Sequence, residues 1–138
     1  KANYSLPTPK IDAYNFSFSG LKNATIQLVN KLKANGELID ADLAYAFQDT
    51  ALHCLLDKSL KAIDELDVKQ FILAGGVACN SRLRELVSEN VKGIKVTLPP
   101  LKYCTDNATM IAAAAFHYLK HEQFVNFSAA SKSSMSIE

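Results

Sequence analysis

Two short apolar segments, each followed by a helical pattern, constrain the fold of this chain of 138 residues more than any other feature. The first segment, residues 69–76 (KQFILAGG), precedes a helix predicted over 80–91. The second, residues 94–99 (IKVTLP), precedes a helix predicted over 105–123. Strands that alternate with helices pair in parallel. The sequence therefore predicts an α/β fold that is rich in helix and has few parallel strands.

Two further helices are predicted upstream of the first strand. One runs from about residue 21 to 34, where Ser19 is the expected N-cap and the Asn-Gly pair at 35–36 ends it. The second runs over 40–66, with Asp40 as its expected N-cap. Its first half is apolar nearly all round, which indicates that it is buried.

The domain organisation follows from the same pattern. Residues 1–15 contain two prolines and predict an extended arm, 16–122 form one lobe, and the Ser-rich stretch 123–138 is expected to be a flexible tail. Within the lobe, residues 16–20 (FSFSG) alternate aromatic and small residues and predict a short strand or an extended segment.

Two strands are too few for a stable sheet. We therefore expect the chain to be an incomplete lobe from a longer protein, and the first residue is Lys1 rather than Met. Apolar surface meant for missing strands predicts that the isolated chain self-associates.

The composition excludes several classes of protein. There are 15 Lys and Arg against 14 Asp and Glu, so a strongly basic nucleic-acid binder is not indicated. Three widely spaced cysteines form no disulfide framework, which fits a reducing compartment such as the cytoplasm. Since no segment approaches about 20 consecutive apolar residues, no membrane association is expected.

The glycine pair Gly75–Gly76 ends the first predicted strand. Ligands of open α/β sheets bind beyond the carboxyl ends of the strands, and glycine lets a ligand approach the backbone closely. A following helix would favour an anion such as phosphate, and Asn80 at its start could cap the helix or reach a ribose or phosphate. A tight turn without a ligand explains the pair equally well, and neither a G-x-G-x-x-G motif nor a G-x-x-x-x-G-K-[ST] loop is present.

Polar residues also follow the second strand. Asp106 lies where a carboxylate could bind a metal ion, although Thr105 or Asp106 as a simple helix cap is the favoured alternative on pattern alone. If the strands are parallel, Asn80 and Asp106 face one cleft.

Other candidate side chains have simpler interpretations. His117 and His121 have a spacing that can hold zinc, but a solvated helix face is favoured. His53 is expected to be a hydrogen-bonded core residue, and Cys79 an inert packed thiol.

Three motifs together resemble one family. NFSFSGLKNA (15–24), ILAGGVACNSRLR (72–84) and YCTDNATMIAAAA (103–115) look like the C-terminal lobe of the TsaD family, the tRNA N6-adenosine threonylcarbamoyltransferases, formerly called glycoproteases. The similarity covers roughly residues 14–120. It implies part of a ribonuclease-H-like lobe of the actin/Hsp70-like ATPase superfamily, in which two lobes enclose a nucleotide.

The resemblance implies an activity and roles for the motif residues. Such an enzyme transfers threonylcarbamoyl from threonylcarbamoyl-AMP to an adenine beside the anticodon of tRNAs that read ANN codons. Gly75 and Gly76 would lie against the adenylate, and Asn80 would bind the substrate. Asp106 would ligate an iron or zinc ion. The implied partners are tRNA and the TsaB-like and TsaE-like subunits of the modifying complex.

The chain also departs from the family pattern. The two family histidines that ligate the metal and the glycine-rich phosphate loop are not in this sequence, so the chain alone is expected to be inactive. Two alternatives remain open: a small-molecule kinase of the same fold class, which would bind an ATP-type nucleotide, and a non-catalytic, partner-binding paralogue.

Overall fold

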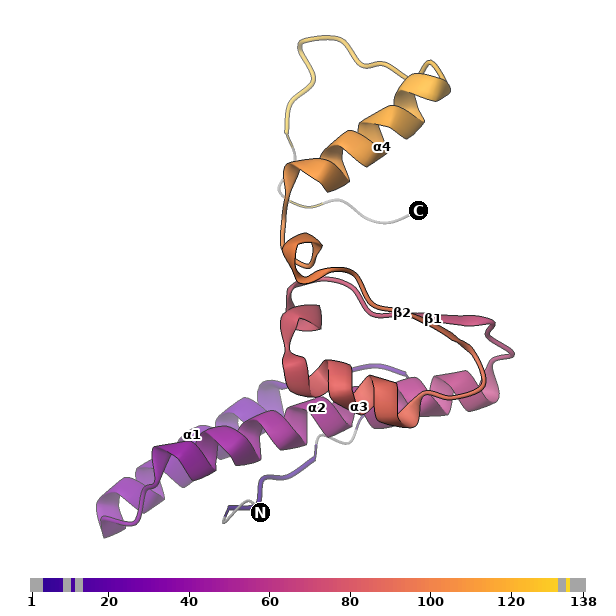
Figure 1. The fold of residues 1–138 in the computed structure, drawn as a ribbon. Coiled ribbons are helices and arrows are strands. Elements are labelled where there is room, and N and C mark those ends of the chain that lie inside the picture. Colours follow the sequence, from indigo (N-terminus) through magenta and orange to yellow (C-terminus); the bar gives the residue numbers. More distant parts are fainter. Residues whose placement is uncertain (1–3, 9–10, 12–13, 132–133, 135–138) are drawn as a thin grey trace.

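A computed structural model of the chain describes residues 4–8, 11, 14–131 and 134. In these residues the elements follow the predicted order, with two short 3-10 helices (η1 and η2) added before α3 and α4 (Figure 1). The elements are α1 (Ser19–Asn35), α2 (Asp40–Glu65), β1 (Gln70–Ile72), η1 (Gly76–Cys79), α3 (Ser81–Asn90), β2 (Lys95–Thr97), η2 (Leu101–Tyr103) and α4 (Ala108–Lys120).

The two strands pair in parallel, as predicted. Phe71 lies opposite Val96, and α3 makes the connection from one strand to the other. The α/β class and the parallel pairing are therefore confirmed. Because the strands run in the same direction, both of their carboxyl ends lie at one edge of the sheet.

The main hydrophobic core lies between α2, α3 and the strand pair (Figure 1). The apolar faces of the two helices meet there, and Phe71 and Val96 pack against them from the sheet. The fully buried members of the cluster are Leu52, Leu56, Leu83, Leu86, Val87 and Val91. This core fixes α3, and with it the turn that precedes α3.

A second, smaller core joins the N-terminal segment to α1 and α2. Leu6, Leu21 and Ala46 are its buried residues. The Tyr4 hydroxyl donates a hydrogen bond to the Glu37 carbonyl oxygen at 2.7 Å and accepts one from the Ile39 amide at 3.0 Å. The described part of the predicted arm therefore packs on the helix pair. Residues 1–3, 9–10 and 12–13 of that arm and 132–133 and 135–138 of the predicted tail lie outside the described residues.

The predicted N-caps of α1 and α2 are wrong. The capping positions are Phe18 and Ile39, whose side chains accept no hydrogen bond, and Ser19 and Asp40 are the first helical residues. The backbone bonds from Lys22 N to Phe18 O and from Leu43 N to Ile39 O extend each helix by one residue. The predicted end of α1 is confirmed, since Gly36 adopts φ 69° there.

Of the two alternatives for residues 16–20, the short strand is wrong. Residues 15–18 have no regular structure, and α1 begins at Ser19. The alternation still has an effect, because the rings of Phe16 and Phe18 stack with centroids 6.4 Å apart. A strand requires the backbone of a neighbouring strand, and β1 pairs only with β2 in the described part of the chain.

The first half of α2 is less buried than predicted. Ala46, Leu52 and Cys54 are buried, but 49% of Tyr45 and 40% of Phe47 remain exposed. The helix is thus covered along one side, where α1 and the N-terminal segment pack on it, and these two rings lie outside that contact.

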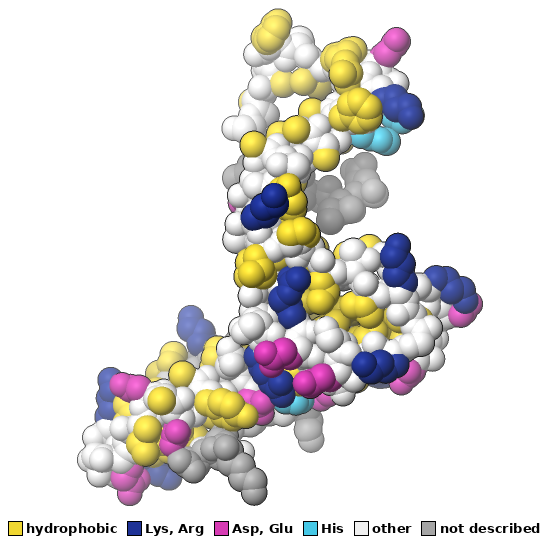
Figure 2. Space-filling model, in the orientation of Figure 1, with side chains coloured by type: hydrophobic (Ala, Val, Ile, Leu, Met, Phe, Trp, Pro, Cys, Tyr) yellow, Lys and Arg dark blue, Asp and Glu magenta, His cyan; other side chains and the backbone are white. Residues whose placement is uncertain are grey.

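Helix α4 stands apart from the rest of the molecule (Figure 1). None of its residues is buried, and Figure 2 shows apolar side chains gathered over it. None of the helices in the described residues combines the length and the apolarity that a membrane crossing requires.

Candidate functional site

A cavity of about 490 Å³ lies beyond the carboxyl ends of β1 and β2. Its lining consists of Ala74, Gly75, Gly76, Tyr103, Cys104, Thr105, Asp106 and Met110. The glycine pair that follows β1 and the carboxylate that follows β2 therefore share one site, because the parallel register places both strand ends at the same edge. Residues 30 positions apart in the sequence meet here only through this pairing.

The two glycines differ in what they require. Gly75 adopts φ 87° and ψ 178°, a conformation essentially restricted to glycine. The φ of Gly76 lies outside the positive range, and a Cβ added there would meet no atom within 4 Å. The backbone thus explains Gly75, whereas at Gly76 neither the backbone nor a neighbouring atom requires glycine.

A 3-10 turn separates the glycine pair from the helix predicted to follow it. Ala78 N donates to Gly75 O and Asn80 N to Val77 O, both at 3.0 Å, and α3 begins only at Ser81. The helix predicted over 80–91 is confirmed, but the 3-10 turn places its N-terminus away from the glycine pair. The N-terminus at the cavity belongs to α4, whose first turn contributes Met110 to the lining.

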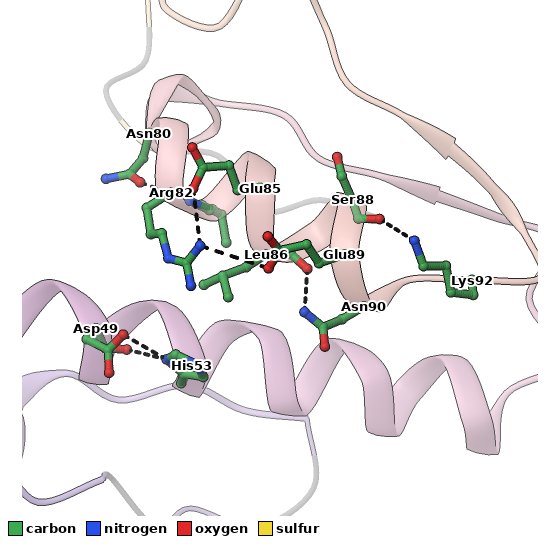
Figure 3. A network of polar contacts seen from close by, with 11 residues as sticks. Asp49, His53, Asn80, Arg82, Glu85, Leu86, Ser88, Glu89, Asn90 and Lys92 are labelled. Atoms are coloured by element: carbon green, nitrogen blue, oxygen red, sulfur yellow. Dashed lines mark hydrogen bonds and ion pairs between the residues drawn. The ribbon is translucent and has the colours of Figure 1, made fainter. Parts of the chain in front are cut away.

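Asn80 occupies the N-cap of α3. Its Oδ1 accepts a hydrogen bond from Leu83 N at 3.0 Å, and its Nδ2 donates to Gln48 Oε1 on α2 at 3.1 Å. Figure 3 shows Asn80 at the start of α3. The expectation that Asn80 and Asp106 face one cleft is not met, since Asn80 is not among the residues that line the cavity. Both ends of its amide group bind protein atoms.

Asp106 lies exposed at the cavity and does not cap α4. The cap is Asn107, whose Oδ1 accepts from Met110 N at 3.1 Å. The alternative in which Thr105 or Asp106 is the cap is therefore wrong. With Asn107 in that role, the Asp106 carboxylate takes no part in starting the helix.

The donor set for a metal ion is incomplete in the described residues. No three His, Cys, Asp or Glu side chains among them are grouped so that they could hold an ion. Asp106 thus offers one ligand, where a tight site needs three or four. The rings of His117 and His121 lie 4.7 Å apart on the exposed face of α4, in agreement with the solvated face predicted for them.

Two other candidate side chains, those of His53 and Cys79, are more exposed than predicted. His53 Nδ1 donates a hydrogen bond to the Asp49 carbonyl oxygen at 2.9 Å (Figure 3), as expected of a hydrogen-bonded residue. However, 44% of its side chain is exposed. Cys79 is exposed rather than packed. Loss of hydration around its sulfur raises the pKa of the Cys79 thiol, and its hydrogen bond with Cys104 raises that pKa further. The charge of Arg84 acts in the opposite direction.

Sequence reasoning missed Arg84 and Tyr103. Tyr103 lines the cavity, and Arg84 binds backbone carbonyls on two segments beside it. The motif SRLR shows that an arginine is present, but the acceptors of its guanidinium are 6 and 15 residues away. Only the tertiary structure identifies them.

A larger cavity, of about 940 Å³, lies along α4, and most of its lining is apolar. Its walls include Ala115, Phe116 and Leu119, and its polar groups come from Tyr118 and Gln123. The smaller cavity, which combines a carboxylate, a hydroxyl and exposed backbone, is therefore the candidate site.

Comparison with known proteins identifies the family. The family model of TsaD, tRNA N6-adenosine threonylcarbamoyltransferase, matches residues 1–113, which is most of the chain. The chain belongs to the TsaD family. Every residue that lines the candidate cavity falls within the matched range.

Curated relatives with the same family name match over most of the chain. A tRNA N6-adenosine threonylcarbamoyltransferase of Fusobacterium nucleatum is 49% identical over 116 residues, which cover 82% of this chain and 34% of the relative. That of Enterococcus faecalis is 43% identical over 86% of this chain and 35% of the relative. That of Bacillus subtilis is 43% identical over 83% and 35%. The chain thus spans about a third of the length of these TsaD relatives.

Proposed function

We propose that this chain forms one wall of the adenylate site in a tRNA N6-adenosine threonylcarbamoyltransferase. The observation that carries the proposal is the shared cavity of Gly75, Gly76 and Asp106, inside the range that matches the TsaD family. The reaction is an acyl transfer. The exocyclic amine of a tRNA adenine attacks the carbamoyl carbon of threonylcarbamoyl-AMP, the C–O bond to phosphate breaks, and AMP leaves.

The glycine turn suits the adenylate. Gly75 adopts a conformation that other residues avoid, and Gly76 adds no side chain to the cavity lining. A flat base or a phosphate can therefore lie directly against the backbone. The positive end of the α4 dipole, next to Met110, favours the charge on the leaving phosphate.

We assign Asp106 as one metal ligand of the complete enzyme, of the iron or zinc type. Its carboxylate lies at the cavity and is not used by the α4 cap. Because the described residues contain no group of three possible ligands, a complete donor set would need ligands from outside them.

Asn80 would act on the substrate indirectly. Its cap fixes the start of α3 and its amide bonds to α2, so it sets the position of the turn that carries Gly75 and Gly76. A direct contact with the ligand would require its amide to leave Gln48.

The complete enzyme would have the two-lobed architecture of the actin/Hsp70-like superfamily. The parallel pair and the helices of this chain would then be part of one ribonuclease-H-like lobe, with tRNA as substrate and TsaB-like and TsaE-like proteins as partners. The exposed apolar side chains of α4 would be covered by the rest of the protein.

The test is transfer by the full-length protein. It is incubated with threonylcarbamoyl-AMP and a tRNA that reads an ANN codon, and the nucleosides are analysed by mass spectrometry. We expect threonylcarbamoyladenosine and AMP in equal amounts. Absence of the modified nucleoside, together with ATP-dependent phosphorylation of a sugar, would instead support a small-molecule kinase.

A further inference from the structure

Arg84 connects two segments of the chain that lie on opposite sides of the candidate cavity. It is half-buried on α3. Its Nη1 donates a hydrogen bond to the Ala78 carbonyl at 2.9 Å, and its Nη2 donates one to the Pro99 carbonyl at 3.0 Å. One planar guanidinium therefore holds two backbone carbonyls.

The two carbonyl acceptors belong to the two chain segments that form the walls of the cavity. Ala78 lies in the turn that begins with Gly75 and Gly76, and Pro99 lies on the segment that leads from β2 to Asp106. Arg84 Nη1 also lies 4.0 Å from the sulfur of Cys104, which is part of the cavity lining. Arg84 itself does not line the cavity, so it acts on the site through these segments.

Few other polar contacts join the two walls. The sheet ends with the hydrogen bond from Leu73 N to Thr97 O at 3.2 Å. Beyond this bond, the other hydrogen bonds between the walls in the described residues are weak contacts of the Cys79 thiol, with Leu101 O at 3.7 Å and with the Cys104 thiol. Sulfur is a poor donor, so the guanidinium is the strong connection.

We propose that Arg84 is a positioning residue that sets the separation of the glycine turn and the Asp106 segment. The inference rests on the proposed function, because it concerns the shape of the adenylate site. Arginine suits the role since its rigid fork presents several N–H groups in one plane. Lysine has a single flexible ammonium and cannot hold both carbonyls in the same geometry.

The first experiment measures how readily the Asp106 segment opens when no ligand is bound. Amide hydrogen exchange is followed in the full-length protein for Tyr103 and Cys104, whose N–H groups donate to Pro100 O at 2.9 Å and Leu101 O at 3.1 Å. In Arg84→Met we expect exchange at both amides to rise by about tenfold or more, the loss expected for hydrogen bonds to a charged group. Amides of Leu86 and Val87 in the core should exchange as in the wild type.

The matched control is Arg82→Met on the same helix. Arg82 pairs with Glu85 at 3.1 Å and Glu89 at 3.9 Å on α3 (Figure 3), and it does not line the cavity. Its loss should leave exchange at Tyr103 and Cys104 unchanged. If the two methionine variants exchange alike at these amides, or if Leu86 and Val87 accelerate equally, Arg84 has only a general structural role and the inference is overturned.

The second experiment uses AMP as a probe, with its Kd determined by calorimetry. Arg84→Met should weaken AMP binding by about tenfold or more, whereas Arg82→Met should change it by no more than about twofold. Arg84→Lys is measured in the same way and should resemble Arg84→Met; it also replaces Arg84→Met if that variant does not fold. Equal affinities in the Arg84 and Arg82 variants overturn the inference. A wild-type protein that binds no AMP contradicts the proposed function instead, and the exchange rates still decide whether Arg84 joins the walls.

Discussion

At the scale of single residues, Gly75 and Gly76 have separable roles. Glycine is required at position 75 because the backbone there adopts φ 87° and ψ 178°. Gly76 has an ordinary backbone, and a Cβ added there would meet no other atom. Adjacent glycines in one motif therefore give a way to distinguish folding from ligand binding.

We predict opposite effects of alanine at these two positions. Gly75→Ala should lower the free energy of unfolding of the full-length protein by about 1–3 kcal/mol, the usual cost of a strained backbone. Gly76→Ala should leave stability nearly unchanged and weaken AMP binding, because it adds a methyl group to a residue that lines the cavity. Chemical denaturation and calorimetry measure the two quantities. Unaltered AMP affinity in Gly76→Ala would mean that the glycine pair is a turn and no more.

Asp106 can be tested with a substitution that preserves its shape. Asp106→Asn should lower the metal content of the purified full-length protein and abolish threonylcarbamoyl transfer, with little change in the melting temperature, since Asn107 rather than Asp106 caps α4. Elemental analysis gives the metal content. Wild-type metal stoichiometry in this variant would remove Asp106 from the ligand set.

The Cys79 thiol provides a prediction of pH dependence. Loss of hydration raises its pKa, and the hydrogen bond and charge of Cys104 add to the rise. A raised pKa means less thiolate at a given pH, so alkylation by iodoacetamide should reach its half-maximal rate above the pH expected for an ordinary cysteine, about 8.5. Arg84→Met removes a charge that lowers this pKa, so the midpoint should move further upward. A midpoint below that of a model thiol would contradict this description of the site.

At the scale of elements, side-chain caps at the start of α3 and α4 determine where each wall of the site is placed. Asn80 and Asn107 accept hydrogen bonds from Leu83 N and Met110 N. The starts of α1 and α2, in contrast, have no side-chain cap. The two capped helices are those that follow the strands: α4 contributes Met110 to the cavity, and α3 follows the turn that carries the glycine pair.

Two substitutions at Asn80 separate its cap from any direct role in binding. Asn80→Ala should cost about 1 kcal/mol of stability, as expected for a lost cap. Asn80→Asp keeps the acceptor for Leu83 N but loses the donor to Gln48, so most of the stability should remain. If Asn80→Asp nevertheless abolishes AMP binding at unchanged melting temperature, its amide contacts the ligand and the indirect role is wrong.

At the scale of the whole molecule, apolar surface is concentrated on α4 and on the segment after it. Exposure reaches 66% for Ile111, 68% for Phe116 and 71% for Phe124, and Figure 2 shows apolar side chains uncovered at this end of the molecule. Such a surface usually binds a partner, which in the complete enzyme would be the remaining polypeptide.

The 138-residue polypeptide by itself is therefore expected to self-associate and to show no transfer activity. Light scattering should give a mass above that of one chain, 15.1 kDa. The double substitution Phe116→Glu and Leu119→Lys should shift the mass towards that of the monomer, because it charges the apolar face of α4. Thr109→Glu, which charges the same helix in its first turn, is the control. A strictly monomeric wild-type polypeptide would contradict this prediction.

Local chemistry in the sequence determined the elements of this protein and their order. The periodicity of apolar residues, Gly36 and Asn80 as helix boundaries, and the alternation of strands with helices are all properties of neighbouring residues, so one chain is enough to detect them. The three motifs also carried the family membership, which the matched family model confirms. The parallel pairing followed from the alternation, and with it the meeting of the glycine pair and Asp106 at one edge.

Tertiary structure decided the contacts between residues that are distant in the chain. The alternation in residues 16–20 is a local signal for a strand, yet no neighbouring strand in the described part of the chain pairs with them, and a strand depends on its partner's hydrogen bonds. The position of Asn80 outside the cavity depends on Gln48, which α2 brings to it. The role proposed for Arg84 depends on carbonyl groups 6 and 15 residues away. Hydrogen-bond partners at such separations are set by how α3 packs on α2 and the sheet. This packing cannot be deduced from the spacing of residues in the sequence.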